Sequence, residues 1–156
     1  MRPKKSQGFT LLEVLIALVI FSFGLLALAA LMAKGLQYNT SALHRSYASS
    51  QAYDMADRMR ANQLALEHPF YYKDINPPAG DPPSCLCDDE CPCDREAMAT
   101  FDAWQWNSMN AAVLPSGSGT VKKKNGTSYY TISISWNENR FESTEGSEKF
   151  EFEFHP

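Results

Sequence analysis

The residues best suited to chemistry are four cysteines that lie within one nine-residue stretch, Cys85-Leu86-Cys87-Asp88-Asp89-Glu90-Cys91-Pro92-Cys93. Thiols this close together either form disulfides or bind a metal ion. Zinc sites favour cysteine pairs separated by two to four residues, so a pair with a single intervening residue is a poorer chelate. The acidic residues of the loop lack the glycine and the distal glutamate of a calcium-binding EF-hand. We therefore expect two disulfides and no metal.

The spacing alone leaves the disulfide pairing open, because four cysteines allow three pairings. Bonds within Cys85–Cys87 and within Cys91–Cys93 are disfavoured, since each ring would close over a single residue and be strained. The nested pairing joins Cys85 to Cys93 and Cys87 to Cys91. The crossed pairing joins Cys85 to Cys91 and Cys87 to Cys93, and the sequence does not choose between these two.

The remaining sequence offers no catalytic set. His44, His68 and His155 are scattered, with no carboxylate or cysteine spaced to complete a catalytic group. No nucleophile elbow, phosphate-binding loop or zinc-hydrolase helix occurs. The net charge of −4 gives no broad basic surface for nucleic acid. We expect a protein that is not an enzyme and that has no cofactor and no nucleic-acid partner.

The N-terminal part of the chain contains twenty consecutive residues without a charge, from Val14 to Ala33. At about 1.5 Å per residue this run spans roughly 30 Å, the thickness of a bilayer core. The basic residues Arg2, Lys4 and Lys5 precede it. The positive-inside rule therefore keeps the N-terminus cytoplasmic and sends the rest of the chain into the periplasm, where disulfides form.

One carboxylate, Glu13, stands at the head of this apolar run. A carboxylate costs about 2.5–3.5 kcal/mol at the centre of a membrane helix on insertion scales, so it needs a partner. A cleavable secretory signal, with Ala27-Leu28-Ala29 as the small-residue cleavage site, is one interpretation. An ordinary membrane anchor is another. Neither of them gives Glu13 a partner.

A third interpretation accounts for Glu13. The sequence Gly8-Phe9-Thr10-Leu11-Leu12-Glu13-Val14-Leu15 resembles the leader junction of type IV prepilins and pseudopilins. The resemblance implies that prepilin peptidase cuts after Gly8 and methylates the new amine of Phe9, while the apolar run is kept. Glu13 would then neutralise that amine and set the register between subunits. Two opposite charges about 4 Å apart attract by about 4 kcal/mol at an effective dielectric near 20.

A single long helix is expected over residues 9–64, with a transmembrane segment at about 11–33, because no proline interrupts residues 4–68. In its second half, apolar residues recur at spacings of four, three and four. This places them on one helix face that can support a globular head. They are Ala48, Ala52, Met55 and Met59.

The last turns of this helix carry four charges, Asp54, Asp57, Arg58 and Arg60. A solvated helix face is the simplest interpretation, and Asp54 and Arg58 have the favourable order for an ion pair four residues apart. The segment 52–62 also resembles the end of the long helix in PilV-type minor pilins, as does Trp104-Gln105-Trp106-Asn107. That resemblance makes the four charges candidate contacts to an adjacent minor pilin or to a loop of the head.

Residues 65–156, including the cysteine loop 85–93, are expected to form a small periplasmic head of the α+β class. Asp94 can cap a helix that ends near Val113. Three antiparallel strands are expected at 120–124, 127–136 and 150–154, the first two joined by a two-residue Asn-Gly hairpin at 125–126. The two helices would cover the apolar face of the sheet. The expected apolar face of the second helix is Met98, Phe101, Trp104, Trp106, Met109 and Val113.

The resemblance implies a minor pilin that crosses the inner membrane once, with its head in the periplasm, and that then enters a type IV pilus at the cell surface. It implies roles in adhesion, twitching motility and priming of assembly. Its implied partners are prepilin peptidase, other minor pilins, the major pilin, the pilus assembly platform and a tip adhesin. Three alternatives are a type II secretion minor pseudopilin, a membrane-anchored periplasmic binding domain outside any filament, and a thiol or metal enzyme.

Overall fold

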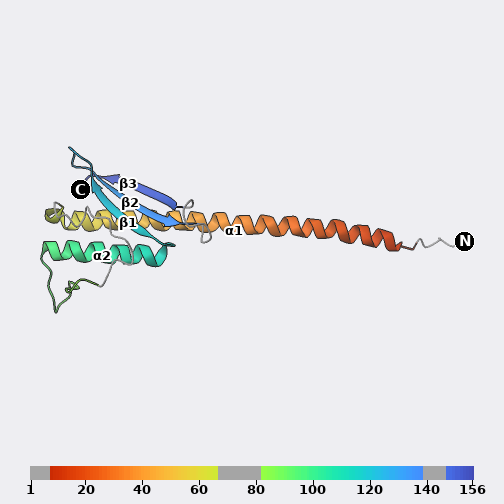
Figure 1. The fold of residues 1–156 in the computed structure, drawn as a ribbon, viewed down its shortest axis with the longest axis horizontal. Helices are drawn as coiled ribbons and strands as arrows, with labels where there is room; N and C mark the ends of the chain where they lie inside the picture. The colour runs from red at the N-terminus through yellow and green to blue at the C-terminus, as the bar shows by residue number, and fades with distance from the viewer. Residues whose placement is uncertain (1–7, 67–81, 139–146) are drawn as a thin grey trace, which may run out of the picture. The chain divides into compact units, whose positions relative to one another are not determined.

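The computed structural model describes residues 8–66, 82–138 and 147–156. Contacts divide the chain into two compact units, residues 1–40 and residues 41–156. The long N-terminal helix, second helix and three-stranded antiparallel sheet confirm the predicted α+β, pilin-like arrangement (Figure 1). The elements in chain order are the α-helix α1 (Leu11–Ala61), the 3-10 helix η1 (Gln63–Ala65), the α-helix α2 (Arg95–Val113), and the strands β1 (Ser118–Lys123), β2 (Tyr130–Asn137) and β3 (Ser147–Phe154).

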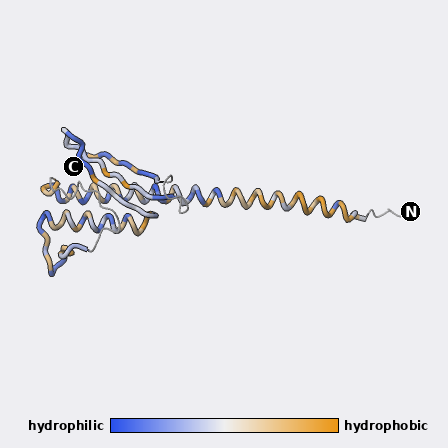
Figure 2. Tube along the Cα trace, viewed as in Figure 1, coloured by the Kyte–Doolittle hydropathy of each residue, from blue (hydrophilic) through white to orange (hydrophobic). Residues whose placement is uncertain are grey.

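The first unit is the N-terminal part of α1, and every described side chain in it is exposed. Figure 2 shows this stretch as a hydrophobic band along the helix. By length and composition the helix can cross a membrane. The helix is continuous through Gly24 and Gly35, and a Cβ added at either glycine would meet no atom within 4 Å. Packing against the described residues therefore gives no reason for glycine at these two positions.

The second unit has its core between the sheet and the two helices. The helix face predicted from periodicity, Ala48, Ala52, Met55 and Met59, is buried as expected, and Ala56 joins it. From β2, the alternating residues Tyr130, Ile132, Ile134 and Trp136 fill the other side of this core. Burial of these side chains from both directions is what stabilises the head.

The sheet has the order β1-β2-β3, and both pairs are antiparallel. On β3, Phe154 is buried, whereas Phe150 and Phe152 are only partly covered. The ring of Tyr53 from α1 packs against Phe152 with 4.7 Å between ring centroids. The hydroxyl of Tyr130 donates a hydrogen bond to the carbonyl of Leu66 at 3.3 Å, which ties β2 to the chain after η1.

The two-residue hairpin predicted at Asn125-Gly126 is wrong. Lys123 is the last residue of β1 and pairs with Tyr130, so a longer segment connects the strands. The carbonyl of Lys124 accepts hydrogen bonds from the backbone N–H and the hydroxyl of Thr127, at 3.1 and 3.0 Å. Gly126 has a φ of +74°. This positive φ at the third position is typical of a type II turn, which lengthens the connection beyond the primed hairpin turn.

The predicted apolar face of α2 is also largely wrong. Of those six residues only Trp106 is buried, and Met109 is 47% exposed. The reason is a close approach between α2 and β1. A Cβ at Gly119 would lie 2.1 Å from the ring of Trp106 and 2.8 Å from the side-chain nitrogen of Asn110. The face that meets the core is built mostly of small and polar residues: Ala99, Asp102, Ala103, Trp106, Asn107 and Asn110.

This close approach gives a stability prediction. Gly119→Ala places a methyl group inside the Trp106 ring contact, and overpacking of this kind costs about 1–3 kcal/mol. Urea unfolding of the full chain in detergent, followed by tryptophan fluorescence, should show a lower midpoint for Gly119→Ala. Ser128→Ala, at an exposed loop position, is the control and should leave the midpoint unchanged. Equal midpoints for the two variants would contradict the contact.

Candidate functional site

The predicted cleavage junction lies just before the long helix. Gly8 and Phe9 are exposed and precede the first residue of α1, Leu11. The hydroxyl of Thr10 accepts a hydrogen bond from the backbone N–H of Glu13 at 3.4 Å, and the carbonyl of Thr10 accepts one from the same N–H at 3.1 Å. Thr10 therefore caps α1. Thr10 was not among the predicted functional residues, although its Thr-x-x-Glu spacing is the signature of a capping box.

Glu13 lies in the first turn of α1, and it is exposed. Carboxylates are favoured there because the unpaired N–H groups of the first turn make this end of a helix positive. A cut after Gly8 would place a second positive charge, the amine of Phe9, at the same end. An anion at Glu13 would therefore balance both the helix terminus and the new amine if the chain is cut there, which no residue of the uncharged run after it could do.

The apolar run that follows has a surface suited to packing against another apolar helix or lipid. A shallow groove lies along one face of this part of α1, and Ser22 is its only polar lining residue. The hydroxyl of Ser22 donates a hydrogen bond to the carbonyl of Leu18 at 2.7 Å. Side-chain ridges of a neighbouring helix fit such grooves. The residues that line it are Leu15, Leu18, Val19, Ser22, Phe23 and Leu26.

In the head, the charged cluster is divided between an internal and an external pair. Arg58 donates hydrogen bonds to Asp54 at 2.9 Å, to Asp102 at 3.0 Å and to Gln105 at 2.6 Å. Asp102 is only 8% exposed. Asp54 and Arg58 therefore tie α1 to α2 within the same chain.

Asp57 and Arg60 form the external pair. They bind each other at 2.9 Å, and both side chains are substantially exposed. The guanidinium of Arg60 also lies over the ring of Phe154, 5.3 Å from its centroid. Exposed ion pairs of this kind contribute about 0–1 kcal/mol to stability. Of the four predicted contact residues, these two are the ones whose charges a partner can reach most readily.

Further charges line the solvent side of the sheet. Lys149 forms an ion pair with Glu151 on β3. The hydrogen bond and the positive charge of Lys149 hold the pKa of the Glu151 carboxyl below its ordinary value, with a smaller contribution from the hydroxyl of Ser133. Lys124 pairs with Glu153 at 3.3 Å. These pairs are exposed, so they contribute little to stability.

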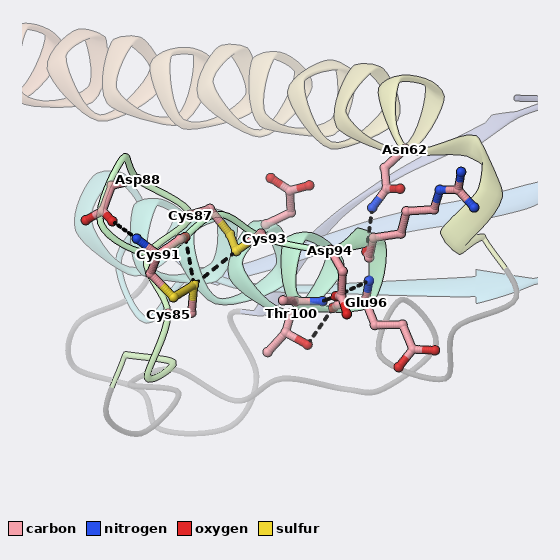
Figure 3. Close-up of a disulfide and its surroundings, with 12 residues drawn as sticks. Asn62, Cys85, Cys87, Asp88, Cys91, Cys93, Asp94, Glu96 and Thr100 are labelled. Carbon is pink, nitrogen blue, oxygen red and sulfur yellow. Dashed lines mark hydrogen bonds between the residues drawn. A yellow bond between two sulfur atoms is a disulfide. The ribbon is translucent and has the colours of Figure 1, made fainter.

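The cysteine loop adopts the crossed pairing. Disulfides join Cys85 to Cys91 and Cys87 to Cys93, and no cysteine is free (Figure 3). Three of the sulfurs, those of Cys85, Cys87 and Cys93, lie within 4.8 Å of one another, a spacing that would also suit a metal ion. A sulfur in a disulfide is not available as a thiolate ligand for a metal ion. The two disulfides therefore act as covalent cross-links within the loop.

The loop leads directly into α2. Asp94 follows Cys93 and caps this helix, because its carboxylate accepts hydrogen bonds from the backbone N–H groups of Glu96 and Ala97 at 3.1 and 2.8 Å, as predicted. The side chain of Asn62, just after α1, donates to the carbonyl of Arg95 at 2.8 Å (Figure 3). The end of α1, the start of α2 and one disulfide thus meet.

A cavity of about 330 Å³ lies at this junction, roughly the size of a small-ligand pocket. Its lining carries two carboxylates and two guanidinium groups. The lining residues are Arg58, Ala61, Asn62, Cys93, Asp94, Arg95, Met98 and Asp102.

Comparison with known proteins bears on the N-terminal segment. Residues 3–29 match the family model of the prokaryotic N-terminal methylation motif. The match includes Gly8, Phe9 and Glu13 together with most of the uncharged run. Comparison with curated proteins and with solved structures gave no match.

The match supports a type IV pilin-like prepilin leader and indicates a type IV pilin-like or pseudopilin protein. Such a motif implies processing by prepilin peptidase and assembly with other pilins. Together with the apolar first part of α1, it fits a membrane-anchored pilin. The resemblance of segment 52–62 to PilV-type minor pilins lies outside the matched residues and stays a prediction.

The Arg58 contacts give a second stability prediction. Arg58→Gln removes the guanidinium that binds Asp54, Asp102 and Gln105, and breaking a buried ion pair of this kind costs roughly 3–5 kcal/mol. Because the side chains of Arg58 and Asp102 keep some exposure, a loss near the lower end is expected. Asp57→Asn, which removes an exposed pair on the same helix, is the matched control and should cost less than about 1 kcal/mol. Urea unfolding of the full chain measures both, and similar losses would contradict an internal role for Arg58.

Proposed function

We propose that this chain is a minor pilin of the PilV type, which is inserted in the inner membrane and then incorporated in, or primes the assembly of, a type IV pilus. One observation carries the pilin-like part of the proposal, and the resemblance of segment 52–62 to PilV-type minor pilins supports the finer part. The methylation-motif match covers the start of α1, where Glu13 lies in the first turn and is followed by an exposed run of residues without a charge. A cleavable signal would discard this helix, and a plain anchor would have no use for the acid.

The mechanism rests on charge neutralisation in an apolar surrounding. The amine created at Phe9 needs an anion, and Glu13 of the same subunit or of a neighbour supplies it. Because a buried charge without a partner is expensive, subunits would dock only where an amine and a carboxylate meet. A single polar contact inside an apolar helix bundle sets register in the same way.

The proposed topology places the N-terminus in the cytoplasm and the head in the periplasm. Three basic residues and no acidic residue lie in the first eight positions, which favours cytoplasmic retention of that end. Two disulfides in a loop of nine residues support an oxidising compartment for the head. In the assembled state the head would be displayed at the cell surface.

The proposed partners are prepilin peptidase, other minor pilins, the major pilin, the assembly platform and a tip adhesin. Asp57 and Arg60 are the proposed contact residues of the head, since they are exposed and paired only with each other among ionic partners in the described part of the chain. The proposed role is structural and not enzymatic. Trp106 is a core residue of the head, because it is buried and its ring N–H donates to the carbonyl of Gln51 at 2.8 Å.

A type II secretion minor pseudopilin is the second candidate, because the matched motif indicates both classes. The PilV-like segment 52–62 favours the pilus. Deletion of the gene separates the two: loss of twitching with normal exoprotein secretion supports the pilus, and the reverse result supports the secretion system.

Glu13→Ala tests the proposed assembly step. The variant should insert in the membrane at the normal level and be cleaved, yet its amount in sheared fibres should fall about tenfold or more, because the attraction lost is worth about 4 kcal/mol at an effective dielectric near 20. Immunoblots of membranes and of sheared fibres measure both quantities. Glu90→Ala removes the same charge from the cysteine loop and is the control. Normal incorporation of Glu13→Ala would contradict the pairing.

A further inference from the structure

The two disulfides of the cysteine loop are in contact with each other. The sulfur of Cys85, which is bonded to Cys91, lies 3.4 Å from the sulfur of Cys93, which is bonded to Cys87 (Figure 3). The sulfurs of Cys85, Cys87 and Cys93 lie within 4.8 Å of one another, and the sulfur of Cys91 is not in this group. One sulfur of each disulfide is therefore next to a sulfur of the other.

The inner cysteines of the loop, Cys87 and Cys91, are separated by three exposed acidic residues, Asp88, Asp89 and Glu90. The carboxylate of Asp88 accepts hydrogen bonds from the N–H groups of Glu90 and Cys91 at 3.2 and 2.9 Å, which holds this part of the loop in a turn. Both inner cysteines are half-buried, so a small molecule can reach them from solvent. Such a molecule meets a negatively charged surface.

We propose that the cysteine loop is a site of thiol–disulfide exchange, at which a small thiol without net negative charge interconverts the crossed and the nested pairing. The contact between the sulfurs of Cys85 and Cys93 is the link between the two pairings, because a bond between these sulfurs is the outer bond of the nested pairing. This inference does not depend on the proposed function, since it rests on the loop alone.

The exchange consists of three displacements, each by a thiolate on a disulfide sulfur. The incoming thiol loses its proton to water, attacks Cys91, forms a mixed disulfide there and releases Cys85 as a thiolate. Cys85 then attacks Cys93 and releases Cys87. Cys87 attacks the mixed disulfide at Cys91 and expels the incoming thiolate, which regains a proton. Three S–S bonds break and three form without net transfer of electrons, so the thiol acts as a catalyst.

The same sulfur contact serves an attack on the other inner cysteine. A thiolate that attacks Cys87 releases Cys93, which attacks Cys85 across the 3.4 Å contact and releases Cys91. Chain entropy favours neither pairing strongly, because the crossed bonds have sequence separations of six and six and the nested bonds of eight and four. A loop that first oxidises to the nested pairing can therefore reach the crossed pairing by the reverse steps.

The acidic residues of the loop determine which thiols react fastest. The thiolate of glutathione carries a net negative charge, whereas the thiolate of cysteamine is balanced by its own ammonium group. Asp88, Asp89 and Glu90 repel the first and not the second. Cysteamine should therefore open the loop faster than glutathione, and the difference should shrink as added salt screens the charges.

The first test uses the native full chain purified in detergent. The chain is incubated with a catalytic amount of cysteamine and quenched with acid, and the pairing is assigned by partial reduction, alkylation and tandem mass spectrometry. We expect the crossed pairing before incubation and a mixture of crossed and nested pairings after it. Persistence of the crossed pairing alone overturns the proposal, and so does a nested fraction that is the same with and without the thiol.

The second test isolates the sulfur contact. Cys91→Ser leaves the Cys85 thiol beside the disulfide between Cys87 and Cys93, and the free thiol should become shared between Cys85 and Cys87. Alkylation before and after reduction, with two different reagents, locates it. Cys85→Ser is the matched control, because it leaves only the thiol of Cys91, which lies outside the close group, and that thiol should stay on Cys91. A free thiol confined to Cys85 in the first variant, or equally mobile in both, overturns the proposal.

The third test addresses the choice of thiol. Asp89→Asn/Glu90→Gln removes two charges and keeps Asp88, which holds the turn. The double variant should be opened by glutathione about threefold faster than the native chain, while the rate with cysteamine should stay within about twofold. Equal acceleration with both thiols, or acceleration with neither, contradicts the selection of thiols by charge.

Discussion

The uncovered, uncharged first part of α1 is the constraint on which the rest depends. From Val14 to Ala33 its side chains are exposed and carry no charge. A large apolar side chain gains about 1.5–3 kcal/mol when it leaves water, so this helix requires lipid or other apolar helices around it. The matched leader junction, the acid in the first turn and the two glycines that contact no described residue all lie in or directly before this segment. A water-soluble chain would have no physical reason to keep them.

The head is stabilised differently, by contacts that hold two helices and a small sheet together around the end of α1. Close contact between α2 and β1 is permitted by glycine at positions 117 and 119, where a Cβ would lie 2.2 Å from the Asn110 carbonyl and 2.1 Å from Trp106, respectively. The Arg58 contacts join α1 to α2, and the crossed disulfides compact the segment before α2. The four charges at the end of α1 thus have two kinds of contact: Asp54 and Arg58 belong to the network that reaches α2, and Asp57 and Arg60 pair with each other at the surface.

Sequence periodicity was sufficient where one face of an element meets a continuous core. It predicted the buried residues of α1 from Ala48 to Met59 and those of β2 from Tyr130 to Trp136, and the Asp94 cap followed from local chemistry. Periodicity did not predict the buried face of α2. The burial of Ala99, Asn107 and Asn110 depends on how closely β1 approaches this helix. The prediction of a two-residue hairpin was wrong because Gly126, which has a positive φ, belongs to a longer connection between β1 and β2. The crossed pairing stayed open in the sequence, since the spacing of the cysteines fits the nested pairing equally well.

The most direct measurement is the mass of the N-terminal peptide of the chain recovered from membranes. We expect the mature chain to begin at Phe9, with a methyl group on its amine and with Glu13 and the whole uncharged run still present. A functional chain that retains residues 1–8 would contradict the account, and so would a chain cut after Ala29, because neither leaves a new amine beside Glu13.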